Sequence, residues 1–273
     1  MRASLRRIWG MLFRHVSLYR RSWPRLLELA YWPTLQMVIW GLTARFFAAR
    51  LGVAAAGASG ALLTAASVLL GGVLLWEFAL RSQMGVAISF LEEIWSRNLG
   101  HVFVSPLRPA ELVTALFTIS VLRTLAGVLP AVLLAWMLYA FNLFAMGPVL
   151  ILFMVNLMAM GWWVSLAVVS LILRHGAGAE ALAWSVLFGL APFSCVFYPV
   201  STLPAALRPL ALALPSAHVF EGMRAVLNHG VIAWCHLGWA IGLNALWMAA
   251  AALLFARQFR AARVRGALLT IGE

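Results

Sequence analysis

Long apolar runs dominate this sequence and leave few charged side chains to cover a fold in water. Of its 273 residues, 64% are hydrophobic and 10% are charged, whereas a soluble domain carries roughly 25% charged residues. We therefore expect lipid to be much of the solvent of this chain. Because lipid cannot hydrogen-bond to the backbone, the segments inside it are predicted to be helices, which bond every N–H and C=O internally.

Six apolar segments are predicted to cross the membrane, since a spanning helix needs about 20 apolar residues. The predicted spans cover about 28–49, 61–84, 112–139, 148–173, 180–198 and 233–256. The fold class is therefore an all-α membrane protein with six transmembrane helices, and residues 1–273 form a single transmembrane domain.

Residues 4–22 place apolar side chains at helical three- and four-residue steps, with arginines between them. The apolar positions are Leu5, Ile8, Trp9, Leu12, Val16 and Tyr19. This pattern predicts an amphipathic interfacial helix in the headgroup plane. A cleaved signal peptide ending near residues 54–61 is the alternative, but the apolar stretch after the arginines is longer than such a peptide requires, which favours a retained signal anchor.

The net charge of +12 comes from arginines that flank apolar spans. Seven arginines lie in the first 25 residues, and four more are Arg257, Arg260, Arg263 and Arg265. Such clusters indicate the cytoplasmic side and attract anionic lipid headgroups. We predict a multi-pass protein of the plasma (bacterial inner) membrane with cytoplasmic N- and C-termini, membrane lipids as partners and no nucleic-acid partner.

The sequence contains no lysine and no aspartate. A phosphate-binding P-loop needs its lysine, and the accompanying Mg²⁺ is usually held with the help of an aspartate. If the protein uses ATP, we therefore expect a separate chain to hydrolyse it, and no cofactor is expected on this chain. We also predict no catalytic residues and no metal site, because the histidines and cysteines lack ligand spacing. The sequence does not decide whether Cys195 and Cys235 form a disulfide.

Five of the eleven prolines lie between residues 192 and 231. They interrupt the apolar runs, which become too short to span a bilayer. We predict a re-entrant helical hairpin over 199–231, before the last span. An ordinary apolar loop packed on the bundle is the alternative.

Three segments in this order resemble the type-2 ABC transporter permeases (ABC-2 family), the membrane subunits of drug, polysaccharide and nodulation-factor exporters. The first is the arginine-rich helix that runs into span one at Tyr19–Arg25. The second is the loop with Leu91-Glu92-Glu93-Ile94-Trp95 and then Ser105-Pro106-Leu107. The third joins Phe197-Tyr198-Pro199 to Pro215 and Glu221-Gly222-Met223-Arg224. The loop departs from the family pattern at 96–100, so the register of its helix is left open.

The resemblance implies a coupling helix at about 89–100 that inserts into an ABC ATPase. Its predicted contact residues are Leu91, Glu92, Glu93, Ile94, Trp95 and Arg97, with Ile94, Trp95 and Leu99 as an apolar knob inside a charged rim. A solvated loop that only ends span two is the alternative. The resemblance further implies two ATPase copies, which hold ATP and Mg, and a second permease copy in a homodimer, or a related chain in a heterodimer.

The resemblance also places a substrate path at the dimer seam formed by spans one, two and five. Candidate lining residues are Trp32, Trp40, Trp76, Phe193, Phe197 and Tyr198, although aromatic residues in spans more often pack or lie at the interface. Glu77 and Arg123 lie inside predicted spans, where charge is costly. We expect Glu77 to pair with Arg123, or with Arg81 one helical turn away.

Together these features predict the permease subunit of an ATP-driven ABC exporter that moves an amphipathic, lipid-linked, saccharide or drug-like substrate out of the cytoplasm or inner leaflet by alternating access. An ion-gradient-driven secondary transporter is the alternative, with Glu77 as its acidic candidate. A membrane enzyme is the weakest reading, since no catalytic cluster is present. Asn156 and Asn244 are predicted to hydrogen-bond between helices.

Overall fold

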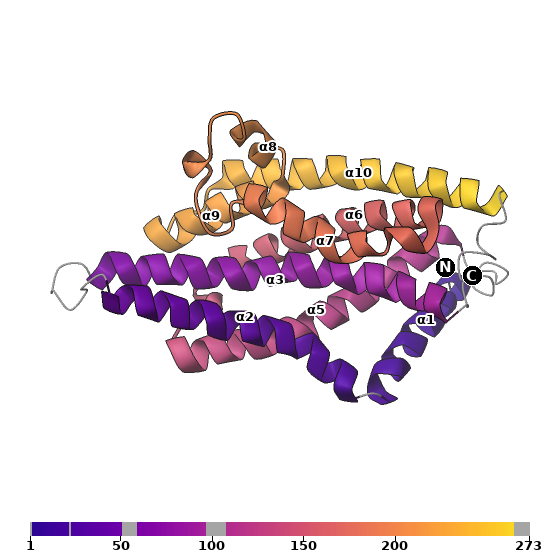
Figure 1. Cartoon of the computed structure of the whole chain (residues 1–273), viewed down its shortest axis with the longest axis horizontal. Helices are drawn as coiled ribbons and strands as arrows, with labels where there is room; N and C mark the ends of the chain where they lie inside the picture. Colours follow the sequence, from indigo (N-terminus) through magenta and orange to yellow (C-terminus); the bar gives the residue numbers. More distant parts are fainter. Residues whose placement is uncertain (1, 22, 51–58, 97–107, 265–273) are drawn as a thin grey trace.

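The computed structural model describes residues 2–21, 23–50, 59–96 and 108–264, and every regular element in those ranges is helical (Figure 1). The long helices are α1 (Arg2–Arg21), α2 (Trp23–Arg50), α3 (Ser59–Trp95), α5 (Pro109–Tyr139), α6 (Val149–His175) and α10 (Trp234–Val264). The short ones are η1 (Leu143–Met146), η2 (Gly176–Ala179), α7 (Ala181–Leu190), η3 (Ala191–Ser194), η4 (Val200–Thr202), α8 (Arg208–Leu212) and α9 (Pro215–His229). The predicted all-helical fold is confirmed.

Four of the described helices are long and apolar enough to cross a membrane. They are Ala65–Trp95, Pro109–Tyr139, Val149–His175 and Trp234–Val264. The segments predicted as spans one and five also contain helices, but α2 includes polar and aromatic residues such as Gln36 that lower its hydropathy, and α7 has only 10 residues. The count of six spans therefore stays a prediction.

The structure extends two of the predicted spans toward the end of the bundle where the termini lie (Figure 1). Helix α3 continues to Trp95 instead of stopping near residue 84, and α10 continues to Val264 instead of stopping near residue 256. The prediction of a separate short helix over 89–100 is therefore wrong for the described residues 89–95, because they form the last turns of α3. In α10 the helix continues past the apolar run, since a helix can leave the membrane without breaking, whereas residues 85–91 of α3 are themselves largely apolar.

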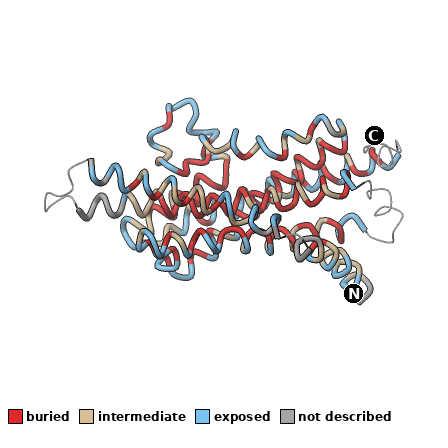
Figure 2. The backbone as a smooth tube through the Cα atoms, turned by 60° about the horizontal axis from the view of Figure 1, so that its bottom comes forward, coloured by how far each residue is buried: buried red, intermediate tan, exposed pale blue. Residues whose placement is uncertain are grey.

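Helix α3 is the centre of the bundle and packs against α2, α5, α6, α7 and α9. Buried residues are concentrated along these inner helices, whereas the outer faces are exposed (Figure 2). Helices α3 and α6 come very close at Gly161, where an added Cβ atom would lie 2.0 Å from the Ser82 hydroxyl oxygen and 2.6 Å from the Ala79 carbonyl oxygen. Small residues permit such contacts, which drive helix association where lipid removes the hydrophobic effect.

A second helix contact is made by polar side chains. Asn244 on α10 donates from Nδ2 to Oδ1 of Asn156 on α6 at 3.0 Å, and Trp163 donates from Nε1 to Asn244 Oδ1 at 3.1 Å. The predicted hydrogen bond between Asn156 and Asn244 is thus confirmed. It joins α10 to the core helices, and each such bond contributes on the order of 1 kcal/mol in a membrane.

The segment predicted as a re-entrant hairpin contains α8 and α9, which lie in the half of the molecule away from the two termini (Figure 1). Helix α9 begins at Pro215 and ends at Gly230, whose φ of +66° is the left-handed conformation that closes many helices. It packs against α3, α6 and α10. Its position fits a hairpin covered by protein, while its insertion into the membrane stays a prediction.

Candidate functional site

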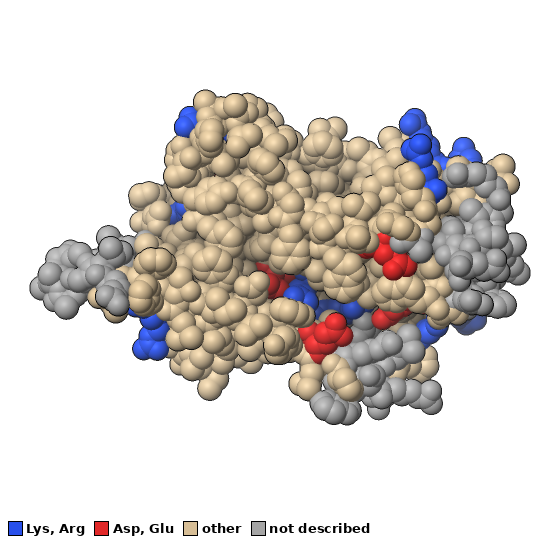
Figure 3. All heavy atoms as spheres, in the orientation of Figure 1, with Lys and Arg blue, Asp and Glu red and all other residues tan. Residues whose placement is uncertain are grey.

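A cavity of about 470 Å³ opens between α2, α3, α5 and α7. Figure 3 shows it as a hollow where acidic and basic side chains gather on an otherwise largely uncharged face. Its charged lining residues are Glu28, Glu77, Arg81, Glu92 and Arg123. Aromatic side chains, including Trp32, Trp184 and Phe188, line the rest. The cavity therefore offers both polar and apolar contacts within the span of the bundle.

Each of the charges predicted within the membrane has a polar partner. Arg81 donates from Nε to Glu77 Oε2 at 3.0 Å. Glu77 thus pairs with Arg81, one helical turn along α3, which was one of its two predicted partners. Arg123 on α5 donates from Nη1 to the Ser89 hydroxyl at 2.9 Å. Glu77 is 3% exposed and Arg123 is 9% exposed. Isolated charge at this depth is costly, and both groups line the cavity with a polar partner beside them.

The six aromatic residues predicted to line a substrate path do not gather around this cavity. Only Trp32 is among the residues that line it. Trp40 stacks on Phe197 with ring centroids 4.7 Å apart, and Trp76 is buried beside Phe220. Phe193 and Tyr198 lie in the segment after α7, which is also outside the lining. Sequence reasoning missed Trp184 and Phe188, because only the fold shows which residues of α7 line the cavity.

Most of the predicted ATPase-contact residues lie on the inside of the bundle. Leu91 and Ile94 are buried in the main core, and Glu93 is 2% exposed. Ile94 of the predicted knob and Glu93 of the predicted rim are therefore not on the surface of this chain, and Glu93 instead contacts α1. Trp95 remains 51% exposed and donates from Nε1 to Glu180 Oε1 at 3.0 Å, and Glu92 lines the cavity. Arg97 and Leu99 lie outside the described residues.

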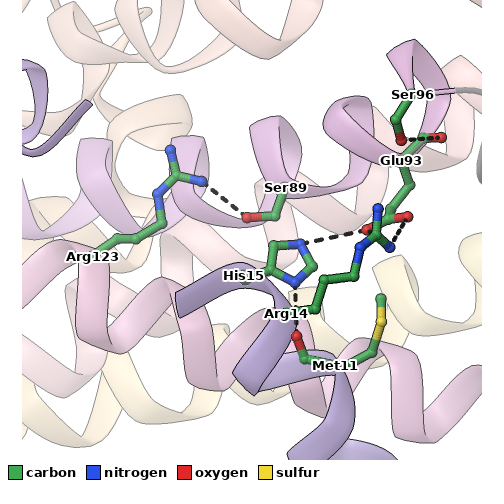
Figure 4. Close-up of polar contacts among 7 residues, drawn as sticks. All are labelled: Met11, Arg14, His15, Ser89, Glu93, Ser96 and Arg123. Carbon is green, nitrogen blue, oxygen red and sulfur yellow. Dashed lines mark hydrogen bonds and ion pairs between the residues drawn. The ribbon is translucent and has the colours of Figure 1, made fainter. Parts of the chain in front are cut away.

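The buried carboxylate of Glu93 binds the amphipathic helix α1 (Figure 4). Arg14 donates from Nη1 to both carboxylate oxygens, at 2.7 and 2.6 Å. His15 places Nε2 3.7 Å from Glu93 Oε1, and its Nδ1 lies 3.0 Å from the Met11 carbonyl oxygen. Two adjacent residues of α1 thus converge on the end of α3.

A second carboxylate binds α1 at the start of α5. Arg7 donates from Nε to Glu111 Oε2 at 2.8 Å and from Nη2 to Oε1 at 2.5 Å. Ser4 donates to Glu111 Oε1 at 2.7 Å, and the backbone N–H of Arg108 donates to Oε2 at 3.0 Å. We call the Arg14–Glu93 and Arg7–Glu111 pairs the α1 clamp. Its two carboxylates flank residues 97–107 in the sequence.

At the other end of the molecule, polar contacts fix the segment before α10. Arg224 on α9 pairs with Glu221 at 3.1 Å and donates from Nη1 to the Cys195 carbonyl oxygen at 3.0 Å. Glu221 Oε1 accepts the backbone N–H of Val200 at 2.7 Å. Cys195 and Cys235 are both free thiols, the first buried and the second exposed. Glu221 and Arg224, which belong to the third segment that resembles the family, thus connect α9 to the residues after η3.

Residues 6–228 match the family model of the ABC-2 type transporter. The chain belongs to the ABC-2 type transporter family. No similar sequence is found among curated proteins. The match covers most of α1, the four residues of the α1 clamp, every residue that lines the cavity and α9 up to residue 228. The protein is a membrane-embedded permease of this family. Membership in the family implies, in general terms, that it works with an ABC ATPase.

Proposed function

We propose that this permease is the membrane subunit of an ATP-driven exporter, and that closure of a separate ATPase reaches its substrate cavity through the α1 clamp. The α1 clamp is the observation that carries the proposal. Glu93 lies in the last turn of α3 and Glu111 in the first turn of α5, so the intervening residues 97–107 connect two helices that are both bonded to α1. A push on this connection would act on three helices together.

Helix α1 runs into α2 with only residue 22 between their bounds, and α2 forms one wall of the cavity. Displacement of the clamped end of α3 would therefore move α1 and α2 with it. Packed helices switch between discrete arrangements instead of deforming continuously. Alternating access follows if ATP-bound and ATP-free partners favour different arrangements, since a ligand shifts an equilibrium only through differential affinity.

The cavity supports an amphipathic substrate, which includes lipid-linked, saccharide and drug-like molecules. Its ion pair and arginines suit a polar headgroup, while Trp184 and Phe188 are 45% and 54% exposed beside it and suit an apolar portion. This exposed face of α2, α3 and α7 also suits a seam with a second permease. We propose a homodimer, with a heterodimer of related chains as the alternative, bound to two ATPase copies that carry ATP and Mg.

The proposed orientation places both termini and residues 97–107 in the cytoplasm, with α8 and α9 toward the outside of a bacterial inner membrane. The arginines of α1 and the last turns of α10 lie at the same end of the bundle (Figure 1). Positive charge of this density favours the cytoplasmic side.

The test is reconstitution with a candidate ABC ATPase. The permease should co-purify with the ATPase, and export of lipid-linked or drug-like probes from proteoliposomes should require ATP and stop with vanadate. The matched control is the same complex with the P-loop lysine of the ATPase changed to alanine, which keeps the complex but removes hydrolysis. Export that continues without any ATPase, driven by an imposed ion gradient, would contradict the proposal and favour a secondary transporter.

A further inference from the structure

A second cavity, of about 580 Å³, lies on a different face of the permease, between α5, α6 and α10. None of its lining residues belongs to the first cavity. Its apolar part is formed by Val113, Leu166, Ala252, Phe255 and Phe259. We call it the α10 groove. On α10, Ala252, Ala256 and Arg260 are exposed in the groove, whereas Phe255 and Phe259 are only 6% and 5% exposed.

One end of the α10 groove is basic. Arg260 and Arg263 line it from the last turns of α10 and are both exposed. Neither guanidinium makes an ion pair or hydrogen bond with another residue in the described ranges. Pro109 and Ala110 line the groove as well, at the start of α5, where a helix carries partial positive charge. None of the described residues that line the groove is a carboxylate, and Glu111, next to Ala110 in the sequence, is already bonded to Arg7. This end of the groove is thus complementary to an anion.

The groove has a basic end and an apolar end, and its length matches one leaflet of a bilayer. From Arg263 to Ala252 the helix advances 11 residues, or about 16 Å at 1.5 Å per residue. The hydrocarbon core is about 30 Å thick, so this is close to half of it. Leu166 on α6 lies nine residues before the end of that helix at His175, a depth of about 14 Å. The α10 wall therefore runs from two exposed arginines to an apolar end near the middle of the membrane, and Leu166 on α6 lies at a similar depth.

We propose that the α10 groove binds one anionic phospholipid of the cytoplasmic leaflet. Its phosphate lies between Arg260, Arg263 and the first turn of α5, and one acyl chain packs against Val113, Ala252 and Ala256, which are apolar lining residues that are at least partly exposed. The proposal rests on the cytoplasmic placement of the termini given above, but it does not depend on export. Basic pockets between helices on this side of a membrane suit acidic headgroups.

The experiment measures lipid binding to the full-length permease by native mass spectrometry, with phosphatidylglycerol and phosphatidylcholine as competing probes. Wild type should prefer phosphatidylglycerol. In the double variant Arg260→Ala/Arg263→Ala, the ratio of phosphatidylglycerol to phosphatidylcholine binding should fall about thirtyfold. This corresponds to about 2 kcal/mol, since each arginine near the surface contributes about 1 kcal/mol. The matched control is Arg257→Ala, because Arg257 is exposed on the same helix but does not line the groove. Its preference should change by less than threefold.

A second variant tests the groove without removing charge. Ala256 is exposed and lines it, so Ala256→Trp should fill the acyl-chain site and displace both lipids. Leu253→Trp is the control, because Leu253 is 62% exposed on α10 and does not line the groove. The proposal fails if wild type shows no preference, if Arg257→Ala loses as much as the double variant, or if both tryptophan variants behave alike. Each of these results leaves ATP-dependent export intact, so the two proposals fail separately.

Discussion

Loss of Arg14 should loosen the α1 clamp more than loss of any exposed arginine of the same helix. Arg14 makes two charge-assisted hydrogen bonds to a carboxylate whose side chain is 2% exposed, while its own side chain is 36% exposed. Breaking a fully buried pair costs about 3–5 kcal/mol, and a hydrogen bond to a charged group contributes about 1.5–3 kcal/mol. Because water can partly replace the half-exposed guanidinium, we expect Arg14→Ala to lower the free energy of unfolding by about 2–3 kcal/mol.

The measurement is denaturant unfolding of the purified permease in a fixed detergent, followed by tryptophan fluorescence. Arg6→Ala is the control, since Arg6 is exposed on α1 without an ion pair to any described residue. A double-mutant cycle with Glu93→Gln separates the pair from general effects, and residues in direct contact should show a coupling of about 1.5–3 kcal/mol. In the reconstituted complex, Arg14→Ala should still bind the ATPase and hydrolyse ATP but export less per ATP.

Two results would refute this reasoning. If Arg14→Ala and Arg6→Ala lower stability equally, the contact with Glu93 contributes nothing specific. If the cycle is additive within about 0.5 kcal/mol, the two side chains do not act as a pair. An unchanged ratio of export to ATP hydrolysis in a destabilised Arg14→Ala complex would keep the clamp as a stabilising contact but remove it from coupling.

Three further predictions follow from packing and charge. Gly161→Ala should destabilise the permease by about 1–3 kcal/mol in the same unfolding assay, because its Cβ meets Ser82, whereas Gly238→Ala, with open space around it, should be neutral or stabilising. Burial lowers the pKa of His218, so the unfolded chain binds a proton at this residue more readily than the folded chain. The stabilising contribution of the neutral, buried imidazole is therefore present above about pH 6.5 and is lost as pH falls below this value. The thermal unfolding temperature should differ between pH 7.5 and 5.5 in wild type, and much less in His218→Gln. Glu77→Gln leaves its arginine partner unpaired in the cavity, so assembly measured by size-exclusion chromatography or export should fall, and no effect on either would show that the ion pair is dispensable.

The helices were predictable because their signal is local. Apolar length alone located α5 and α6 to within about three residues at each end. The predicted end of α10 was too early because the helix continues through polar residues such as Arg257 and Arg260. The predicted end of α3 was too early although residues 85–91 are largely apolar, so apolarity itself would have allowed a longer helix there. That continuation also explains the error at the predicted coupling helix. On a continuous α3, Ile94 lies three residues after Leu91 and shares its core-facing side, so Ile94 does not form a surface knob with Trp95.

The same division between local and distant contacts holds for the candidate site. The Glu77–Arg81 pair was within reach of sequence reasoning because residues four apart meet on one helix face. Glu93 and Arg14 are 79 residues apart, and nothing in either local pattern names the other. Glu93 was instead assigned to a charged rim, since a carboxylate near a helix end is usually solvated. Only the placement of α1 against the ends of α3 and α5 turns it into a buried partner.

The two cavities divide the surface of the permease between two kinds of neighbour. Helix α3 packs against five other helices and contributes to the first cavity, while α10 packs mainly on α6 and α9 and leaves most of its apolar surface outward. A moving seam therefore suits the face of α2, α3 and α7, where charges are paired but still reachable. The α10 groove, with its basic rim and apolar floor, suits lipid that stays in place. If α1 transmits motion, it does so toward the first cavity, because α1 is bonded to α3 and α5 and runs directly into α2.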